Sequence, residues 1–128
     1  MAAAGPAAGD LLLASSGDRV RLSVVIPTIG RETLERAVAS AAACADEVIV
    51  VADGHPEVNA DLHVDLGAPG LVRNAGAAIA TGDWIGFLDD DDVLVPDAYR
   101  ANWLPHPAAD MILHPMFHPE LGPIPRPG

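Results

Sequence analysis

The stretch that decides the fold is Leu22-Ser23-Val24-Val25-Ile26-Pro27, a near-continuous apolar run. Such a run is typical of a strand that is covered on both faces in a parallel sheet. We expect this strand at residues 20–27, ending at the proline, which cannot donate a hydrogen bond to a neighbouring strand. An apolar repeat at helical spacing follows at residues 34–41, and a second apolar run occupies residues 47–52. Strand, helix and strand in this order form a βαβ unit, so we predict an α/β fold with a mostly parallel, Rossmann-like sheet flanked by helices.

Further elements of the same kind follow this unit. Residues 62–66 alternate in polarity like a short, half-exposed strand, and residues 71–79 repeat at helical spacing. A buried strand is predicted at residues 84–88, because its side chains are apolar, aromatic or small and polar residues bound it. Beyond it, Pro96 could open a short helix through residue 102, and residues 111–113 could add one more strand.

The chain divides into three parts by composition. Residues 1–18 are rich in Ala, Gly and Ser and offer little to a core, so we expect a disordered or loosely attached arm. Residues 19–114 form the predicted domain, and residues 115–128 form a Pro-rich tail that we expect to be extended. The 128 residues are enough for one domain, which would bury about two-thirds of its unfolded surface.

Charge and cysteine content exclude several classes of protein. Eighteen acidic against seven basic residues give a formal charge of −11 without any Lys/Arg cluster, so nucleic acid would be repelled over most of the surface. The one cysteine, Cys44, can form no internal disulfide and no Cys-based metal site. We interpret it as a small buried apolar residue. No apolar run reaches the ~18 residues needed to span a bilayer, and we expect a cytoplasmic protein without a transmembrane segment.

Four consecutive aspartates, residues 89–92, directly follow the strand predicted at residues 84–88. Neighbouring unit charges about 5 Å apart repel by roughly 3 kcal/mol at an effective dielectric of about 20, so such a cluster needs compensation. A divalent cation would provide it, and hard oxygen ligands suit Mn²⁺ or Mg²⁺. The alternative is a solvated acidic turn in which the aspartates cap a helix and face water.

Three polar loops are expected to converge at one edge of the predicted sheet. They are residues 28–31 after the first strand, residues 53–55 after the second and residues 89–92 after the fourth. Ligands of parallel α/β sheets bind outside the carboxyl ends of the strands, where such loops meet. Arg73, near the start of the second helix, could pair there with a carboxylate or a phosphate, although a surface ion pair is the alternative. The arrangement indicates a nucleotide pocket with a metal at its phosphate end.

Four segments of the chain carry a family resemblance. They are residues 23–28 (SVVIPT), 47–54 (EVIVVADG), 73–76 (RNAG) and 82–92 (GDWIGFLDDDD). In this order and at these intervals they resemble the GT-A glycosyltransferases of family 2. The resemblance implies a Rossmann-like half that binds a nucleotide-diphosphate sugar, with an Asp-x-Asp motif at Asp89 and Asp91 holding the metal that bridges the diphosphate.

The resemblance also assigns roles to single residues. Asp91 would be the direct metal ligand, and Asp89 would contact the ribose, the metal or a metal-bound water. Asp53 resembles the acid that recognises the base. A hydrogen bond accepted from a base imino group would favour uracil or thymine, and hence a UDP- or dTDP-sugar, although a simple turn aspartate is the alternative. The expected metal ligands are thus Asp91 and Asp89, and the expected nucleotide-sugar contacts are Pro27, Thr28, Asp53, Arg73, Asp89 and Asp90.

The chain departs from the family pattern in two ways. Ala52 stands where family members often have another Asp, and Ile29-Gly30 replace an aromatic residue and Asn, which affects the expected nucleotide preference. The acceptor-binding half and its general base normally follow the Asp-x-Asp strand, and after Asp97 the only acids are Asp110 and Glu120. Three interpretations therefore stay open. The chain could be the donor-binding half of a metal-dependent glycosyltransferase, completed by further sequence or a partner chain, a non-catalytic nucleotide-binding module or subunit, or an acidic α/β domain without a ligand. A homo-oligomer or a partner chain is also considered.

Overall fold

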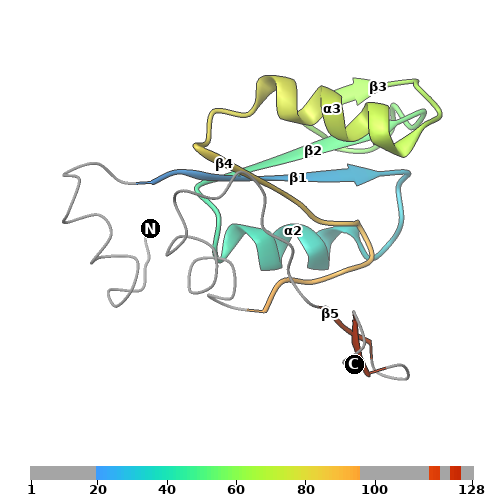
Figure 1. The fold of residues 1–128 in the computed structure, drawn as a ribbon. Helices are drawn as coiled ribbons and strands as arrows, with labels where there is room; N and C mark the ends of the chain where they lie inside the picture. The colour runs from blue at the N-terminus through green and yellow to red at the C-terminus, as the bar shows by residue number, and fades with distance from the viewer. Residues whose placement is uncertain (1–19, 96–115, 119–121, 125–128) are drawn as a thin grey trace.

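The protein folds around a parallel four-stranded sheet with one helix on each face (Figure 1). The computed structural model describes residues 20–95 and the backbone of residues 116–118 and 122–124. The sheet order is β3-β2-β1-β4, and all three strand pairs are parallel. The predicted α/β class and Rossmann-like sheet are therefore confirmed. The sheet and its helices consist of β1 (Leu22–Thr28), α2 (Leu34–Ala42), β2 (Glu47–Asp53), β3 (Leu62–Val64), α3 (Pro69–Ile79) and β4 (Trp84–Phe87).

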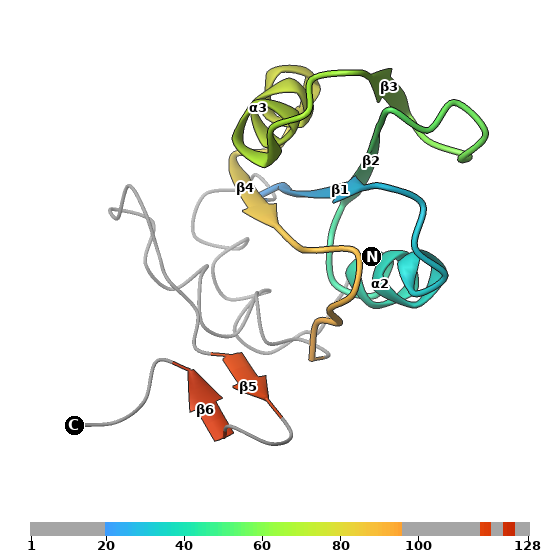
Figure 2. The same ribbon diagram turned by 90° about the vertical axis from the view of Figure 1, so that its right-hand side faces the viewer.

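The core consists of two apolar layers, one under each helix. Figure 2 shows α2 and α3 on opposite sides of the sheet. Alternate residues of a strand point to opposite faces, so Val24 of β1 belongs to the layer under α2 and Val25 to the layer under α3. Both are fully buried, which agrees with the prediction that this strand is covered on both faces. The α2 layer contains Leu22, Val24, Ile26, Ala37, Ala41 and Leu88, and the α3 layer contains Val25, Ile49, Val51 and Val72.

Strand β1 runs one residue past the predicted end, because Pro27 is tolerated inside it. Pro27 lies opposite Val51 of β2. The carbonyl of Val25 accepts a hydrogen bond from the amide of Leu88, so alternate residues of β1, Pro27 included, direct their backbone groups toward β4. Pairing with β4 ends at Val25↔Phe87. Proline has no amide N–H. At Pro27 this N–H would face a position where the pairing between β1 and β4 has already ended.

The outer strands differ from the prediction in length and burial. Strand β3 is shorter than the predicted residues 62–66, and β4 ends at Phe87. Phe87 is 44% exposed, because β4 borders the sheet among the described residues, so this strand is less buried than expected. The helix predicted at residues 96–102, the strand predicted at residues 111–113 and the N-terminal arm lie outside the described residues.

Two short strands lie within the Pro-rich tail. The backbones of β5 (Met116–His118) and β6 (Gly122–Ile124) pair antiparallel with each other (Figure 2). In the part of the chain that the structure describes, no helix has the length and apolarity needed to cross a membrane.

Helix α3 lies close to the sheet because Gly76 carries no side chain. A Cβ at this position would overlap Cγ1 of Val25 and would lie 3.1 Å from Cγ2 of Val51. Gly70, in the first turn of the same helix, has no neighbouring atom within 4 Å of such a Cβ. The close approach is therefore local to the middle of α3, just after the turn that carries Val72 and Arg73.

A polar network fastens the opposite, amino-terminal edge of the sheet. Oε1 of Glu47 accepts hydrogen bonds from the Ser23 hydroxyl at 2.7 Å, the Thr81 amide at 2.9 Å and the Thr81 hydroxyl at 3.1 Å. The Ser23 hydroxyl in turn accepts from the Gly82 amide at 2.8 Å. The hydrogen bond from the Thr81 amide, followed by that from Ser23, lowers the pKa of Glu47 below its usual value. This carboxylate therefore joins β1, β2 and the loop before β4.

Glu47→Gln is expected to lower the free energy of unfolding by about 1 kcal/mol at neutral pH, since part-exposed charge-assisted hydrogen bonds are replaced by weaker ones. Because the folded-state pKa of Glu47 is lowered, its contribution is fully present above the unfolded pKa near 4.5 and is lost as the pH falls through the folded value. The difference between the two proteins should therefore shrink below about pH 4. Urea denaturation at several pH values measures it, with Glu32→Gln on the exposed surface as control. A difference independent of pH would contradict the assignment.

Candidate functional site

A cavity of about 530 Å³ opens at the carboxyl ends of β1, β2 and β4. Strands β2 and β3 lie on one side of β1 and β4 lies on the other, so the chain changes direction beside β1. Such a switch point is where parallel α/β sheets bind ligands, and the volume falls in the usual range for small-molecule sites. The lining consists of Pro27, Thr28, Ile29, Arg31, Asp53, Gly67, Pro69, Val72, Arg73, Asp89, Asp90 and Asp91.

The cavity brings together every residue that the sequence assigned to the site. Three of the remaining lining residues were not predicted. Gly67, Pro69 and Val72 come from the loop before α3 and its first turn, where no chemically distinctive side chain marks a site. Ile29 and Arg31 belong to the loop at residues 28–31 that the sequence placed at this edge, although neither was assigned a contact. The positive charge of Arg31 in that loop was a signal that could have identified it.

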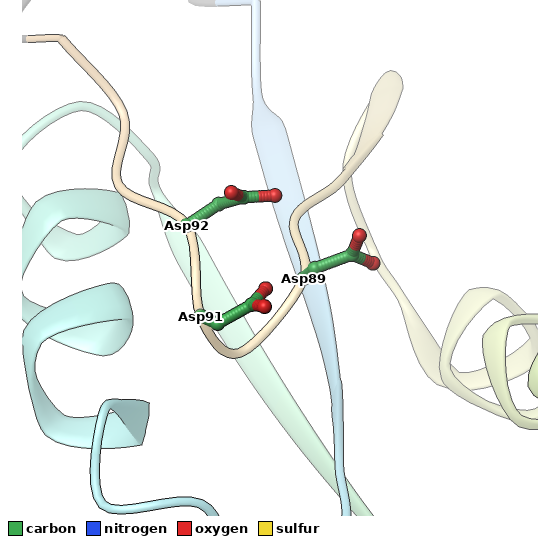
Figure 3. Close-up of side chains that lie close together, drawn as sticks. All are labelled: Asp89, Asp91 and Asp92. Carbon is green, nitrogen blue, oxygen red and sulfur yellow. The ribbon is translucent and has the colours of Figure 1, made fainter. Parts of the chain in front are cut away.

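The acidic turn after β4 gathers three carboxylates. One oxygen from each of Asp89, Asp91 and Asp92 lies within 4.8 Å of the others. In Figure 3 the side chains of Asp91 and Asp92 extend across the inside of the turn, whereas the carboxylate of Asp89 points toward α3. Burial raises the pKa of Asp92, and the charges of Asp91, Asp89 and Asp90 raise it further. The turn therefore concentrates negative charge, and at Asp92 the neighbouring carboxylates oppose ionisation.

These three carboxylates could hold a divalent cation. Oxygen ligands about 2.1 Å from an octahedral ion stand roughly 3 to 4 Å apart, so the observed spacing requires only small side-chain rotations. A cation would also relieve the repulsion that raises the pKa of Asp92. The expected ligands Asp91 and Asp89 are both in this group, and Asp92 joins them as a third that the sequence did not single out.

Asp90 differs from the other three aspartates of the run. It is 6% exposed, and its carboxylate turns toward the loop after β1. Oδ2 accepts hydrogen bonds from the Thr28 hydroxyl at 2.7 Å and the Ile29 amide at 3.4 Å, and Oδ1 lies 3.1 Å from Nε of Arg31. A metal shared by all four aspartates is thus not what this geometry favours. Asp90 lines the cavity, but its carboxylate holds protein groups.

Arg73 extends from α3 toward the acidic turn. Its Nη2 lies 3.3 Å from Oδ1 of Asp89, and both side chains are partly exposed, at 38% and 57%. A pair with this exposure contributes little to stability. The pair does place the positively charged guanidinium of Arg73 beside the acidic turn, and Arg73 lines the cavity.

Asp53, at the end of β2, also lines the cavity. Its carboxylate accepts hydrogen bonds from the amide of Leu66 at 2.7 Å and the amide of Gly67 at 3.1 Å. Gly67 has a φ of +68°, a conformation that glycine adopts without strain. These bonds join the end of β2 to the loop before α3, which is a different role from the local turn that the sequence left open, and the same side chain lines the cavity. A carboxylate has about four lone-pair positions, so these bonds leave capacity for a ligand donor.

The parallel sheet and its cavity place the protein among the Rossmann-like α/β folds. A family model described as glycosyl transferase family 2 matches residues 67–103, which include α3, β4 and the acidic turn. No curated protein matches the chain. The match overlaps the region that carries the sequence resemblance, and it supports a relationship to the family 2 glycosyltransferases and glycosyl transfer as the general chemistry.

Proposed function

We propose that the cavity binds a nucleotide-diphosphate sugar for metal-dependent glycosyl transfer, and that this chain supplies the donor-binding half. The observation that carries the proposal is the cavity itself, which unites the ends of three strands and the start of α3 around all the expected residues. Carboxylates and arginines meet at one end of it, a combination that suits a cation together with a phosphorylated ligand.

The acidic end would bind the metal and the diphosphate. Asp91, Asp89 and Asp92 are the residues that would hold Mn²⁺ or Mg²⁺. When bound, such an ion stabilises the negative charge that develops on a leaving diphosphate. Arg73 lies beside Asp89 and would donate hydrogen bonds to a phosphate oxygen. A ligand that carries negative charge would otherwise be repelled by the four aspartates of the turn.

The other end would bind the nucleoside. Apolar groups of Pro27, Pro69 and Val72 line the cavity together with the carboxylate of Asp53. The Asp53 carboxylate keeps acceptor capacity beside its bonds to the Leu66 and Gly67 amides, so it would favour a base that presents a donor. Uracil and thymine offer an imino donor, so a UDP- or dTDP-sugar remains the proposed donor. Pro27 and Thr28 would contact it from the end of β1.

Transfer also needs an acceptor site and a base for the attacking hydroxyl. The two acids considered for the base, Asp110 and Glu120, lie outside the described residues. The proposal therefore assigns donor binding to the described cavity and leaves the acceptor side to other residues, to a partner chain or to a homo-oligomer. A cytoplasmic location also remains a prediction.

Calorimetric titration with UDP tests the proposal. In the presence of Mn²⁺ the full chain is expected to bind UDP, and without the metal the affinity should fall by about tenfold or more, because the positive charge that would offset the diphosphate is lost. ADP is the control for the base and should bind more weakly than UDP. No binding of UDP with Mn²⁺ would contradict donor binding, whereas equal binding of ADP would contradict only the assigned base.

A further inference from the structure

The buried carboxylate of Asp90 and the side chain of Arg31 form a pair for which donor binding through the acidic turn gives no role. A buried carboxylate is costly unless it is paired and hydrogen-bonded. Asp90 meets this requirement through Thr28, Ile29 and Arg31, and its own carbonyl accepts a hydrogen bond from the Thr33 hydroxyl at 2.7 Å. Asp90 therefore ties the loop after β1 to the acidic turn.

The contact between the two side chains uses only one edge of the guanidinium. Nε of Arg31 contacts Asp90. Among the described residues, the two terminal nitrogens of Arg31 make no hydrogen bond. A guanidinium carries five N–H donors, so most of them remain for another acceptor. Arg31 is 54% exposed at its side chain and lines the cavity.

Two arginines therefore border the acidic turn from different walls. Arg31 comes from the loop after β1 and is fixed to Asp90, whereas Arg73 comes from α3 and is fixed to Asp89. Both line the same cavity. An arginine whose orientation is already fixed loses less side-chain freedom on binding an anion than a free surface arginine. Planar guanidinium groups suit phosphate geometry.

We propose that Arg31 is an anion-binding residue of the cavity, which donates to a diphosphate through its terminal nitrogens, and that Asp90 is the positioning residue that holds it there. The inference deepens the proposed function, on which it rests for the identity of the ligand. It assigns to Asp90 a role other than direct ligand contact. The competing explanation is that Arg31 only neutralises a buried carboxylate.

Binding of inorganic pyrophosphate in the presence of Mg²⁺ provides the test, because this probe carries the diphosphate without nucleoside or sugar. Calorimetry compares the full wild-type chain with R31Q, R31K and R36Q. R31Q is expected to bind about tenfold more weakly, the loss of one charge-assisted hydrogen bond, and R31K should be intermediate because lysine lacks the planar fork. R36Q removes the same charge from an exposed position of α2 outside the cavity and should bind like wild type.

The positioning role of Asp90 is tested by a double-mutant cycle with D90N. If Asp90 acts through Arg31, the change in pyrophosphate affinity that D90N causes should differ by about threefold or more between the wild-type and R31Q backgrounds. Equal changes in both backgrounds would overturn the positioning role. Thermal unfolding of each variant shows whether it is folded. R31K and R31Q alter a half-exposed side chain and keep the main claim testable if D90N unfolds.

The outcomes separate this inference from the proposed function. R31Q binding pyrophosphate as tightly as R36Q would overturn the inference, as would a wild-type chain that does not bind pyrophosphate. UDP binding that needs Mn²⁺ but is unaffected by R31Q would leave the proposed function standing alone. Conversely, pyrophosphate binding that depends on Arg31 without any binding of UDP would support the inference and contradict the proposed donor.

Discussion

Asp91→Ala is expected to lower the affinity of the protein for Mn²⁺ by about 100-fold or more, since even outer-shell partners of metal ligands typically account for 10- to 100-fold. Asp91 is one of three residues whose carboxylate oxygens lie within 4.8 Å of one another, and it also lines the cavity. Its removal leaves two carboxylates, of which Asp89 is already paired with Arg73. Isothermal titration calorimetry with Mn²⁺ measures the change in affinity.

Asp65→Ala is the matched control, because it removes the same charge from an exposed residue outside the cavity lining. Net charge alone predicts equal effects of the two substitutions, whereas a metal site predicts an effect only at Asp91. The affinity for UDP in the presence of Mn²⁺ should fall together with metal affinity. Unchanged Mn²⁺ binding by Asp91→Ala would eliminate the acidic turn as the metal site.

Gly76→Ala is expected to lower the free energy of unfolding by about 2 kcal/mol, the usual scale of overpacking in a filled core. The new methyl group would overlap Cγ1 of Val25, which is fully buried. The β-branched side chain of valine has few alternative rotamers, so it cannot move aside easily. The helix propensity of alanine offsets about 1 kcal/mol of the strain. Urea denaturation followed by circular dichroism measures the net loss.

Gly70→Ala provides the comparison within the same helix. Its Cβ would meet no atom within 4 Å. Alanine there should leave stability unchanged or raise it by about 0.4–1 kcal/mol, because it reduces the freedom of the unfolded chain. Only Gly76→Ala is therefore expected to destabilise the protein. A Gly76→Ala protein as stable as the Gly70→Ala protein would show that α3 does not lie as close to the sheet as described.

The fold was accessible from the sequence because its parallel strands are marked by apolar runs. The stretch around Val24 and Val25 predicted a strand covered on both faces, and both residues are fully buried. Prediction failed at the limits of elements, where neighbours decide the outcome. Pro27 continues β1 because β4 has stopped pairing beside it. Phe87 is exposed because β4 lies at an edge of the sheet among the described residues, and a local sequence pattern does not reveal which strand lies at an edge.

The convergence of the three loops was predictable from the sequence, but the orientation of the side chains was not. Sheet topology alone requires the loops that contain Thr28, Asp53 and Asp89 to converge, and the cavity contains all three. Because the four residues of the aspartate run are identical, the sequence does not tell a metal ligand from a residue that bonds to other parts of the protein. Tertiary contacts distinguish them. Of the four aspartates, Asp90 is the one whose carboxylate turns toward Thr28 and Arg31 among the contacts of the described residues.

The way β1 is shared between the two layers of the core has a consequence for cooperativity. Val24 packs in one layer and Val25 in the other, so detaching either helix from the sheet strips cover from the same strand. Thr28, at the end of this strand, is bonded to the anchor of the acidic turn. Local opening of either layer is thereby coupled to the geometry of the cavity. We expect the loops that line the cavity to keep their arrangement only while both helices remain packed on the sheet.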